Sequence, residues 1–219
     1  GDYLKDKLDA KIAVVEALEC PTLLYNGYGE HNIQGIGDKH VPLIHNVMNT
    51  DFVVGVTDRA TNNLNLIFNT NIGKNYLNKR QGFEIEFIER LPEFGFSTIA
   101  NILASIKLAK YMKLGSDDAI ITVATDGADL YLSELNKTKQ DFKGIFDEVS
   151  CAEIFGQYLK GLKTDHTLEL NQKDKERIFN LGYYTWVEQQ GINLNDFEKR
   201  RDQNFWNEHY QYMLSLDDK

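Results

Sequence analysis

The segment Phe52 to Thr57 reads FVVGVT, and it decides the fold class of the chain. It is a short, continuous apolar run rich in β-branched valine, without the alternation of a half-exposed strand. A run of this kind suits a strand buried on both faces, as in a parallel sheet covered by helices. The sequence therefore predicts an α/β fold with a parallel sheet flanked by helices.

Two further runs of the same character lie on either side of this segment in the chain. Ile12 to Leu18 reads IAVVEAL and follows a helix-like DYLKDKL, while Ala119 to Ala124 reads AIITVA. With FVVGVT they predict three buried strands. The segment Phe83 to Ile88 (FEIEFI) alternates apolar and charged residues, which is typical of a short edge strand.

Two helices are predicted between the second and third of these strands. The first runs from about residue 58 to residue 79, with the Asp58 side chain as its N-terminal cap. The second runs from about residue 97 to residue 114, and Gly115 ends it. Apolar residues recur along the second helix at three- and four-residue steps: Ile99, Ile102, Leu103, Ile106 and Ala109.

The chain changes character near residue 140 and becomes rich in charged residues, without proline. Helices are expected over about 142–161, 172–190 and 194–216, so we expect an α/β part over 1–140 and a helical extension over 141–219. Its aromatic side chains are expected to pack on the α/β part or on a partner subunit, and a ligand-binding aromatic cage is the alternative. These aromatic residues are Tyr183, Tyr184, Trp186, Phe197, Phe205, Trp206, Tyr210 and Tyr212.

The composition of the 219-residue chain excludes several classes of protein. With 42% hydrophobic and 26% charged residues, disorder is not its main state. Its 33 acidic against 24 basic residues give a net charge of −9, which argues against a nucleic-acid partner. No apolar run approaches the roughly 20 residues that span a bilayer, so no membrane partner is expected. Cys20 and Cys151 lie far apart and suit a reducing compartment, so the cytoplasm is the expected location.

A first candidate site segment begins with ECPT (19–22), continues through NGYG (26–29) and ends with QGIGDKH (34–40), which contains Gly35 and Gly37. Glycine tolerates positive φ and lets the backbone approach a flat ligand closely, although a G-x-G pair is most often only a tight turn. It is not a dinucleotide-binding fingerprint, because no third glycine opens a helix directly after a strand.

Two further candidate segments follow predicted strands or open predicted helices. LPEFGFST (91–98) leads into the second helix, where Ser97 or Thr98 caps the helix or, alternatively, its N-terminus receives a substrate carboxylate. Thr125 and Asp126 follow AIITVA, and polar side chains at the carboxyl end of a parallel strand are candidates to contact a cofactor.

The histidines do not form a recognisable metal site. His40 and His45 stand five residues apart with Asp38 nearby, but this spacing matches no helix-face pair and no cysteine joins them, so no metal is expected. Surface or capping roles are expected for His31, His166 and His209. A nucleophile elbow and a P-loop are both missing from the sequence, which leaves serine hydrolase and nucleotidase chemistry without support.

Taken in order, these segments resemble the C-terminal half of the fold-type II pyridoxal-phosphate enzymes. That superfamily includes cysteine synthase, cystathionine beta-synthase, threonine synthase and the tryptophan synthase beta subunit. The resemblance to the superfamily covers residues 1–135. The strings GIGDKHVPLIHNVMNTD and NLGYYTWVEQQG also resemble a branch called pyridoxal-phosphate-dependent protein, subunit beta, and residues 136–219 resemble this branch only. The motifs that carry the match are GIGDKHVP (35–42), VTD (56–58), GFS (95–97) and YLS (131–133).

The resemblance implies a pyridoxal 5′-phosphate cofactor and an amino-acid substrate that undergoes β/γ elimination or replacement. It places Gly35 and Gly37 at the cofactor face, and Thr125 or Asp126 at the pyridine nitrogen. A neutral hydroxyl there would leave the nitrogen unprotonated, whereas a carboxylate would hold it protonated and strengthen the ring as an electron sink. The residues expected toward the substrate are Ser97, Asp38 and His40.

The superfamily's Schiff-base lysine and glycine-rich phosphate loop precede the strand that IAVVEAL matches. None of the 18 lysines of this chain matches the cofactor-bearing one. We therefore expect this chain to be the C-terminal portion of an enzyme, with the N-terminal portion as a partner and a homo-oligomer as the assembly. The alternatives are a non-catalytic structural or partner subunit, inert on its own, and a pseudoenzyme that keeps the fold for regulation.

Overall fold

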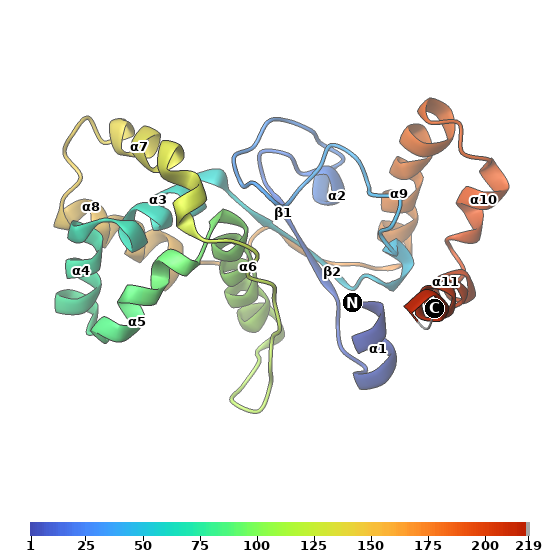
Figure 1. Ribbon diagram of the computed structural model, residues 1–219, viewed down its shortest axis with the longest axis horizontal. Coiled ribbons are helices and arrows are strands. Elements are labelled where there is room, and N and C mark those ends of the chain that lie inside the picture. Colours follow the sequence, from blue (N-terminus) through green and yellow to red (C-terminus); the bar gives the residue numbers. More distant parts are fainter. Residues whose placement is uncertain (218–219) are drawn as a thin grey trace.

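The computed structural model describes residues 1–217, and its strands lie at the centre with helices on both sides (Figure 1). Strands β1 (Ala13–Ala17) and β2 (Phe52–Val56) pair in parallel over their full length. Strand β3 (Thr167–Glu169) pairs antiparallel with the other edge of β2. The predicted α/β class is confirmed, but the sheet is parallel only between β1 and β2 and is mixed as a whole.

The prediction of a strand over Ala119–Ala124 is wrong. These residues form an irregular, exposed segment, in which Ile121 is 78% accessible. The segment is held by a bond from the Asn101 amide to the Val123 carbonyl (3.0 Å) rather than by a neighbouring strand. A β-branched apolar run becomes a strand only where it finds a sheet edge to pair with, and here β3 occupies the free edge of β2.

The predicted helix over 58–79 is two helices, α3 (Asp58–Asn69) and α4 (Asn71–Gln81). Thr70 separates them, because its hydroxyl accepts a bond from the Gly73 N–H (3.1 Å) and caps α4. Asp58 does not cap α3, contrary to the prediction. Thr57 does so by accepting a bond from the Ala60 N–H (3.1 Å).

Segment 83–88 is not an edge strand. Most of it belongs to helix α5 (Ile85–Arg90), in which Ile88 is the buried residue. The Phe83 and Phe87 rings lie 5.7 Å apart, and residues four positions apart share a face in a helix and in a strand alike. The alternation in the sequence was thus compatible with both periods.

Helix α6 (Phe96–Met112) matches the predicted second helix closely. It ends at Lys113, which adopts a left-handed conformation with φ of 56°, and not at Gly115 as predicted. The remaining elements before residue 148 are short helices. They are α1 (Asp2–Leu8), α2 (Thr22–Tyr25), η1 (Val47–Asn49), η2 (Leu91–Glu93), η3 (Ala128–Tyr131) and α7 (Leu132–Asp141).

The C-terminal region is mainly helical, as predicted. Helix α8 (Glu148–Phe155) continues into the π-helical turn η4 (Gly156–Lys160), so the helix expected over 142–161 begins later. Helix α9 (Gln172–Tyr183) continues into the π-helical turn η5 (Tyr184–Gln189). The helix expected over 194–216 is divided into α10 (Leu194–Lys199) and α11 (Gln203–Asp217).

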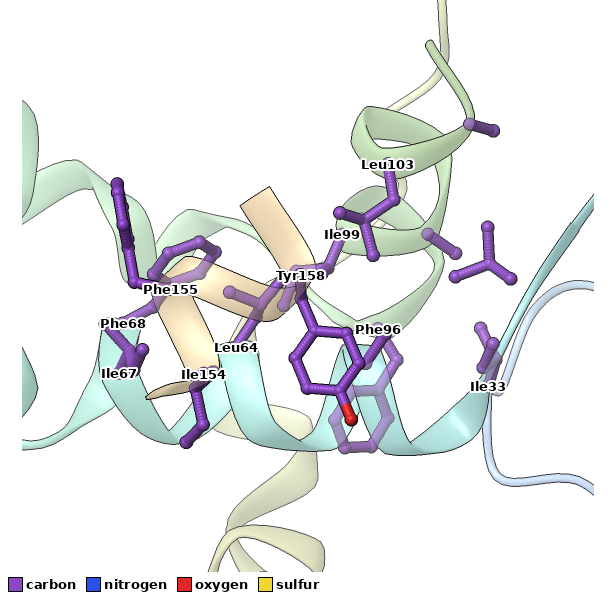
Figure 2. Close-up of a cluster of buried hydrophobic side chains, with 14 of the residues drawn as sticks. Ile33, Leu64, Ile67, Phe68, Phe96, Ile99, Leu103, Ile154, Phe155 and Tyr158 are labelled. Atoms are coloured by element: carbon purple, nitrogen blue, oxygen red, sulfur yellow. The ribbon is translucent and has the colours of Figure 1, made fainter. Parts of the chain in front are cut away.

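Two buried clusters lie on opposite faces of β2, because successive side chains of a strand point to opposite faces. Val54 and Val56 join a first cluster with α3, α6 and α8, whereas Val53 joins a second cluster with α9 and α10. Figure 2 shows how α3, α6 and α8 interdigitate in the first cluster. Its labelled side chains are Ile33, Leu64, Ile67, Phe68, Phe96, Ile99, Leu103, Ile154, Phe155 and Tyr158. Each such side chain stabilises the fold by about 1.5–3 kcal/mol on burial.

Aromatic residues of the C-terminal region pack on the α/β part, as expected for Trp186 and Phe197. The Trp186 indole N–H donates to the Val41 carbonyl (2.8 Å), and Phe197 is fully buried in the second cluster. Because α8 and β3 also belong to the central body, residues 141–170 contribute directly to both faces of the sheet. The boundary near residue 140 stays a prediction.

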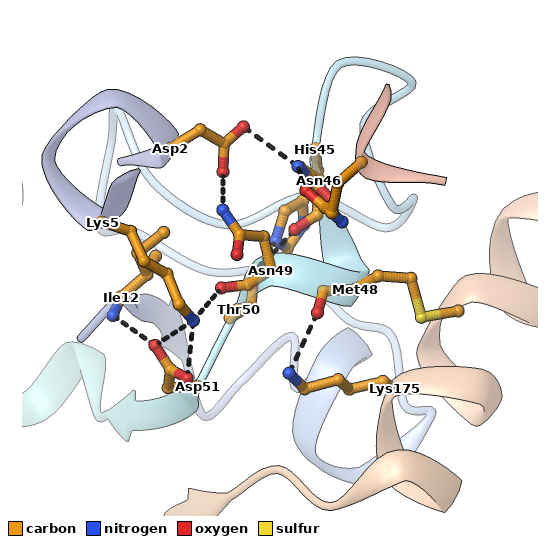
Figure 3. A network of polar contacts seen from close by, with 11 residues as sticks. Asp2, Lys5, Ile12, His45, Asn46, Met48, Asn49, Thr50, Asp51 and Lys175 are labelled. Carbon is orange, nitrogen blue, oxygen red and sulfur yellow. Dashed lines mark hydrogen bonds and ion pairs between the residues drawn. The ribbon is translucent and has the colours of Figure 1, made fainter. Parts of the chain in front are cut away.

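A polar network fixes α1 to the loop that precedes β2 (Figure 3). The Lys5 ammonium donates to both Asp51 carboxylate oxygens (2.8 Å each) and to the Asn49 carbonyl (2.8 Å). Asp51 also accepts the Ile12 N–H (2.7 Å) just before β1. Burial opposes ionisation of Asp51, but Lys5 and the Ile12 N–H outweigh it and lower the pKa of this carboxyl.

Candidate functional site

The turn that contains Gly35 and Gly37 lies between the end of β1 and the start of α6. Both glycines have positive φ, of 89° and 76°, which a side chain would disfavour. A Cβ atom on Gly35 would lie 3.5 Å from the Ser97 hydroxyl oxygen. One on Gly37 would lie 3.1 Å from Nε2 of His31 and 3.7 Å from the backbone nitrogen of Ala17. The turn thus joins two groups of polar residues, described next.

The first group is a hydroxyl–carboxylate cluster made of Ser97, Thr125, Asp126 and Tyr131. The hydroxyls of Ser97 and Thr125 are 3.0 Å apart, and the Thr125 hydroxyl lies 3.4 Å from Oδ1 of Asp126. The prediction that Ser97 or Thr98 caps α6 is wrong. Gly95 is the N-cap and no side chain caps it, because Ser97 already lies inside the helix and its hydroxyl turns to Thr125.

Tyr131 and Gly95 hold Asp126 in place, through its side chain and its backbone carbonyl respectively. The Tyr131 hydroxyl donates to Oδ2 of Asp126, and the Gly95 N–H donates to the Asp126 carbonyl (2.9 Å). A side chain on Gly95 would overlap Oδ1 of Asp126. Burial, together with the bond to Asp126, raises the pKa of Tyr131 to about 12. Tyr131 therefore stays a hydrogen-bond donor to this carboxylate at any physiological pH.

The second group is a strand-end cluster made of Glu19, His31 and Asp58. Glu19 follows β1 by two residues, Asp58 follows β2 by two residues, and the Asp58 N–H donates to Oε2 of Glu19 (3.0 Å). The Asp58 carboxylate accepts the N–H groups of Asn32 (2.6 Å) and Ile33 (3.2 Å). Asp58 therefore orders the loop that carries His31, which explains why its side chain does not cap α3.

The strand-end cluster contains two titratable groups with unusual surroundings. Burial raises the pKa of Glu19, and this effect outweighs the hydrogen bond from the Asp58 N–H, which lowers the pKa. Nδ1 of His31 is buried and has no hydrogen-bond partner among the described residues. A carboxyl and an imidazole in such surroundings can exchange protons with a ligand, so both are candidates for acid–base chemistry.

The sequence placed Glu19 at the start of the first candidate segment without a role, and it predicted only a surface or capping role for His31. Glu19 lies just past the carboxyl end of a parallel strand, where such sheets place their ligand sites. The same rule predicted Thr125 and Asp126 as candidate site residues. His31 carries no such signal. It lies in a loop, and only the folding of the Gly35–Gly37 turn against β1 brings its ring to Gly37.

Asp38 and His40 lie on the exposed part of the same loop, where His40 Nδ1 is 3.2 Å from Oδ1 of Asp38. Asp38 lines a cavity of about 420 Å³ together with Gly37 and His31, next to the strand-end cluster. His40 lines another cavity, of about 450 Å³, between this loop and α9–η5. The structure therefore brings together Gly35, Ser97, Thr125 and Asp126, places Gly37 and Asp38 beside His31, and turns His40 to a different cavity.

The hydroxyl–carboxylate cluster has the donor set that suits one edge of pyridoxal phosphate. The Thr125 hydroxyl and the Asp126 carboxylate are the groups expected at the pyridine nitrogen, and Gly35 leaves the adjacent surface free of a side chain. Ser97, which was expected toward the substrate, lies beside Thr125. Within residues 1–217, no lysine hydrogen-bonds or ion-pairs with these groups. The residues present fit the ring edge of the cofactor, and no side chain for its covalent attachment lies among them.

Over residues 1–217, which the structure describes, the chain has neither a cluster of metal ligands nor a helix that could span a membrane. No group of three or more His, Cys, Asp or Glu side chains there is arranged to hold a metal ion. No helix over residues 1–217 combines the length and apolar character needed to cross a membrane. Both cysteines are buried and unpaired, so Cys20 and Cys151 form no disulfide with each other.

Comparison with known proteins gives one informative similarity. No protein-family model matches the chain, and no solved structure matches it. The chain is 32% identical over 134 residues to cysteine synthase B of Campylobacter jejuni subsp. jejuni serotype O:2. The match covers 61% of this chain and 38% of that protein, so the chain spans well under half the length of this relative. The similarity supports the fold-type II superfamily that the motifs predict, but not the particular branch.

Proposed function

We propose that this chain forms the C-terminal portion of a pyridoxal-phosphate-dependent enzyme that acts on an amino acid by β/γ elimination or replacement. The observation that carries the proposal is the assembly of Ser97, Thr125 and Asp126 against the Gly35 turn, from three segments far apart in the sequence. The similarity to cysteine synthase B supports the same superfamily. The covalent lysine and the phosphate-binding loop belong to polypeptide outside this chain.

In this proposal the hydroxyl–carboxylate cluster holds the ring edge of the cofactor. When bound, pyridoxal phosphate supplies an electron sink for the carbon atoms of the amino acid. The Tyr131 hydroxyl already donates to the Asp126 carboxylate, whereas Thr125 is exposed. We therefore assign contact with the pyridine nitrogen to the Thr125 hydroxyl, with Asp126 as the group that orients Thr125.

The strand-end cluster supplies proton transfer beside this edge. Glu19, whose pKa is raised by burial, holds a proton closer to neutral pH than an ordinary carboxyl does. His31 lies against Gly37, at the junction between the turn and the cavity that Asp38 lines. We propose that Asp38 and Ser97 face the substrate side of the pocket, and that the role first expected for His40 passes to His31.

The test is carried out on the enzyme that contains this chain. Its visible absorbance should show a lysine-linked cofactor, and borohydride should fix the cofactor and abolish activity. Thr125→Val should weaken the retention of the cofactor or shift its spectrum, while Thr125→Ser and the distant Thr138→Ser should leave both unchanged. A protein that purifies colourless and takes up no pyridoxal phosphate contradicts the proposal.

The second candidate is a non-catalytic structural subunit, which is favoured by the lack of any lysine bonded to the cluster within residues 1–217. Mixing separates the two. If this chain is half of a split site, adding the N-terminal portion should restore cofactor binding, and the Thr125→Val variant should restore less. If the complex forms but binds no cofactor, the structural role is correct.

A further inference from the structure

A second cavity lies outside the site described above, between the loop 26–41 and the α9–η5 helix. Its volume is about 450 Å³, and its wall combines two tyrosines, two carboxamides and two basic side chains. The residues concerned are Tyr28, Tyr184, Asn26, Gln189, Lys39 and His40. The volume is ample for a small organic ligand.

The charge of this wall is opposite to that of the chain. The chain carries 33 acidic residues and a net charge of −9, yet no Asp or Glu lines the cavity. His40 is paired with Asp38, but Lys39 makes no ion pair with any residue from 1 to 217. An unpaired ammonium in a concave site without carboxylates attracts an anionic group.

The remaining lining groups favour a flat ring. Tyr28 and Tyr184 are 80% and 62% exposed although both line the cavity, so their faces are open to stacking. Arg177 donates to Oδ1 of Asn26 and so fixes the orientation of this carboxamide. Its Nδ2 group has no acceptor among the described residues and is free to donate to a ligand. Gln189 supplies a second carboxamide at the far side.

We propose that this cavity binds a small aromatic anion, that is, a planar ring that carries a phosphate or carboxylate group. Lys39 binds the anionic group, the tyrosines stack on the ring, and the carboxamides hydrogen-bond to its edge. The site does not depend on the function proposed above. Lys39 also lines the smaller cavity beside Gly37, so occupancy here alters the loop that carries His31.

The proposal is tested by titrating phenyl phosphate into the ¹⁵N-labelled chain and following backbone amide shifts. Saturable shifts should map to residues 26–28, 39–41 and 184–189. Benzoate tests a ring that carries a carboxylate instead of a phosphate. Inorganic phosphate tests the anion without a ring, and benzyl alcohol tests the ring without an anion. Each half alone should bind more weakly than phenyl phosphate.

Matched variants make the test specific. Lys39→Gln should weaken phenyl phosphate binding about tenfold and reduce its salt dependence, while Lys173→Gln on α9 should not. Tyr184→Ala should weaken phenyl phosphate binding roughly threefold or more. Tyr212 is equally exposed, at 62%, but does not line the cavity, so the control variant Tyr212→Ala should have no effect. Absence of saturable shifts, shifts that map elsewhere, or equal loss in the control variants would overturn the proposal.

Discussion

At the scale of single residues, the glycines of the 35–37 turn matter because of what they lie against. Gly37 and Gly82 have nearly the same φ, 76° and 75°, and so the same intrinsic penalty for a side chain. They differ in surroundings, since a Cβ on Gly37 would lie 3.1 Å from the His31 ring, whereas Gly82 has nothing within 4 Å. Comparing substitutions at Gly37 and Gly82 therefore separates the cost of backbone strain from the cost of displacing a neighbouring side chain.

We predict that Gly82→Ala lowers the free energy of unfolding by about 1 kcal/mol through backbone strain alone. Gly37→Ala should cost the same amount plus the displacement of His31, and should shift the His31 ring resonances. Urea unfolding and histidine NMR spectra measure the two effects. Equal costs with an unmoved His31 spectrum would show that the turn does not hold this ring.

His45 gives the fold a defined pH dependence. Burial and the nearby Arg200 lower the pKa of His45 to about 4, while Asp2 opposes them. The unfolded state binds a proton near pH 6.5 and the folded state only near 4, so stability falls as the pH drops through this range. The full loss is about 3 kcal/mol, at about 1.4 kcal/mol per pKa unit.

We predict that His45→Gln removes most of this slope, because glutamine keeps a polar group near Thr50 without titrating. The free energy of unfolding in urea, measured between pH 4.5 and 7, should show it. His209→Gln on the exposed face of α11 should keep the slope of the parent chain. A slope that survives in His45→Gln would assign the pH dependence to other groups.

At the scale of elements, a buried lysine ties α6 to the sheet. Lys107 donates to the Gly55 carbonyl on β2 (2.9 Å) and to the Asp165 carbonyl (2.8 Å) just before β3. Burial lowers the pKa of the Lys107 ammonium, and the nearby Asp165 opposes this effect. Because two backbone carbonyls accept its N–H groups, Lys107 acts as a structural hydrogen-bond donor. Lys107 thereby holds β3 against one edge of β2, where a further parallel strand would otherwise pair.

We predict that Lys107→Met lowers the free energy of unfolding by about 2 kcal/mol, because two buried carbonyls lose their donor. Lys110→Met is the matched control. Its ammonium donates to the exposed Leu162 carbonyl, so this change should cost less than about 0.5 kcal/mol. Thermal unfolding of the two variants decides, and equal midpoints would contradict the role given to Lys107.

The segment Ala119–Ala124 offers a direct test of strand against loop. Because Ile121 is 78% exposed, Ile121→Lys should change the free energy of unfolding by less than about 0.5 kcal/mol and should improve solubility. Val54→Ala in the fully buried strand β2 should cost about 2 kcal/mol or more. A large loss for Ile121→Lys would mean that this segment is buried in a sheet after all.

At the scale of the whole molecule, the two buried clusters depend on distant parts of the chain. Cys151, Ile154, Phe155 and Tyr158 enter the first cluster from the α8–η4 region, and β3 covers an edge of β2. Helix α11, by contrast, contributes no side chain to either cluster over its described residues.

We therefore predict that a chain ending at residue 140 does not unfold cooperatively, whereas one ending at residue 202 does, with a lowered midpoint. Circular dichroism during thermal unfolding and the dispersion of the amide NMR spectrum measure this. A cooperative transition in the chain that ends at residue 140 would instead make the boundary near residue 140 a true domain boundary.

The sequence by itself determined β1, β2, α6 and most C-terminal helices, because their apolar residues follow a period that one element can satisfy alone. It also pointed to Gly35, Ser97, Thr125 and Asp126, which the fold assembles into one cluster. Only the tertiary structure decided the fate of Ala119–Ala124, the arrival of β3 and the positions of Glu19 and His31. The physical reason is that a strand or a polar site needs a partner from elsewhere in the chain, and local pattern does not specify which segment supplies it.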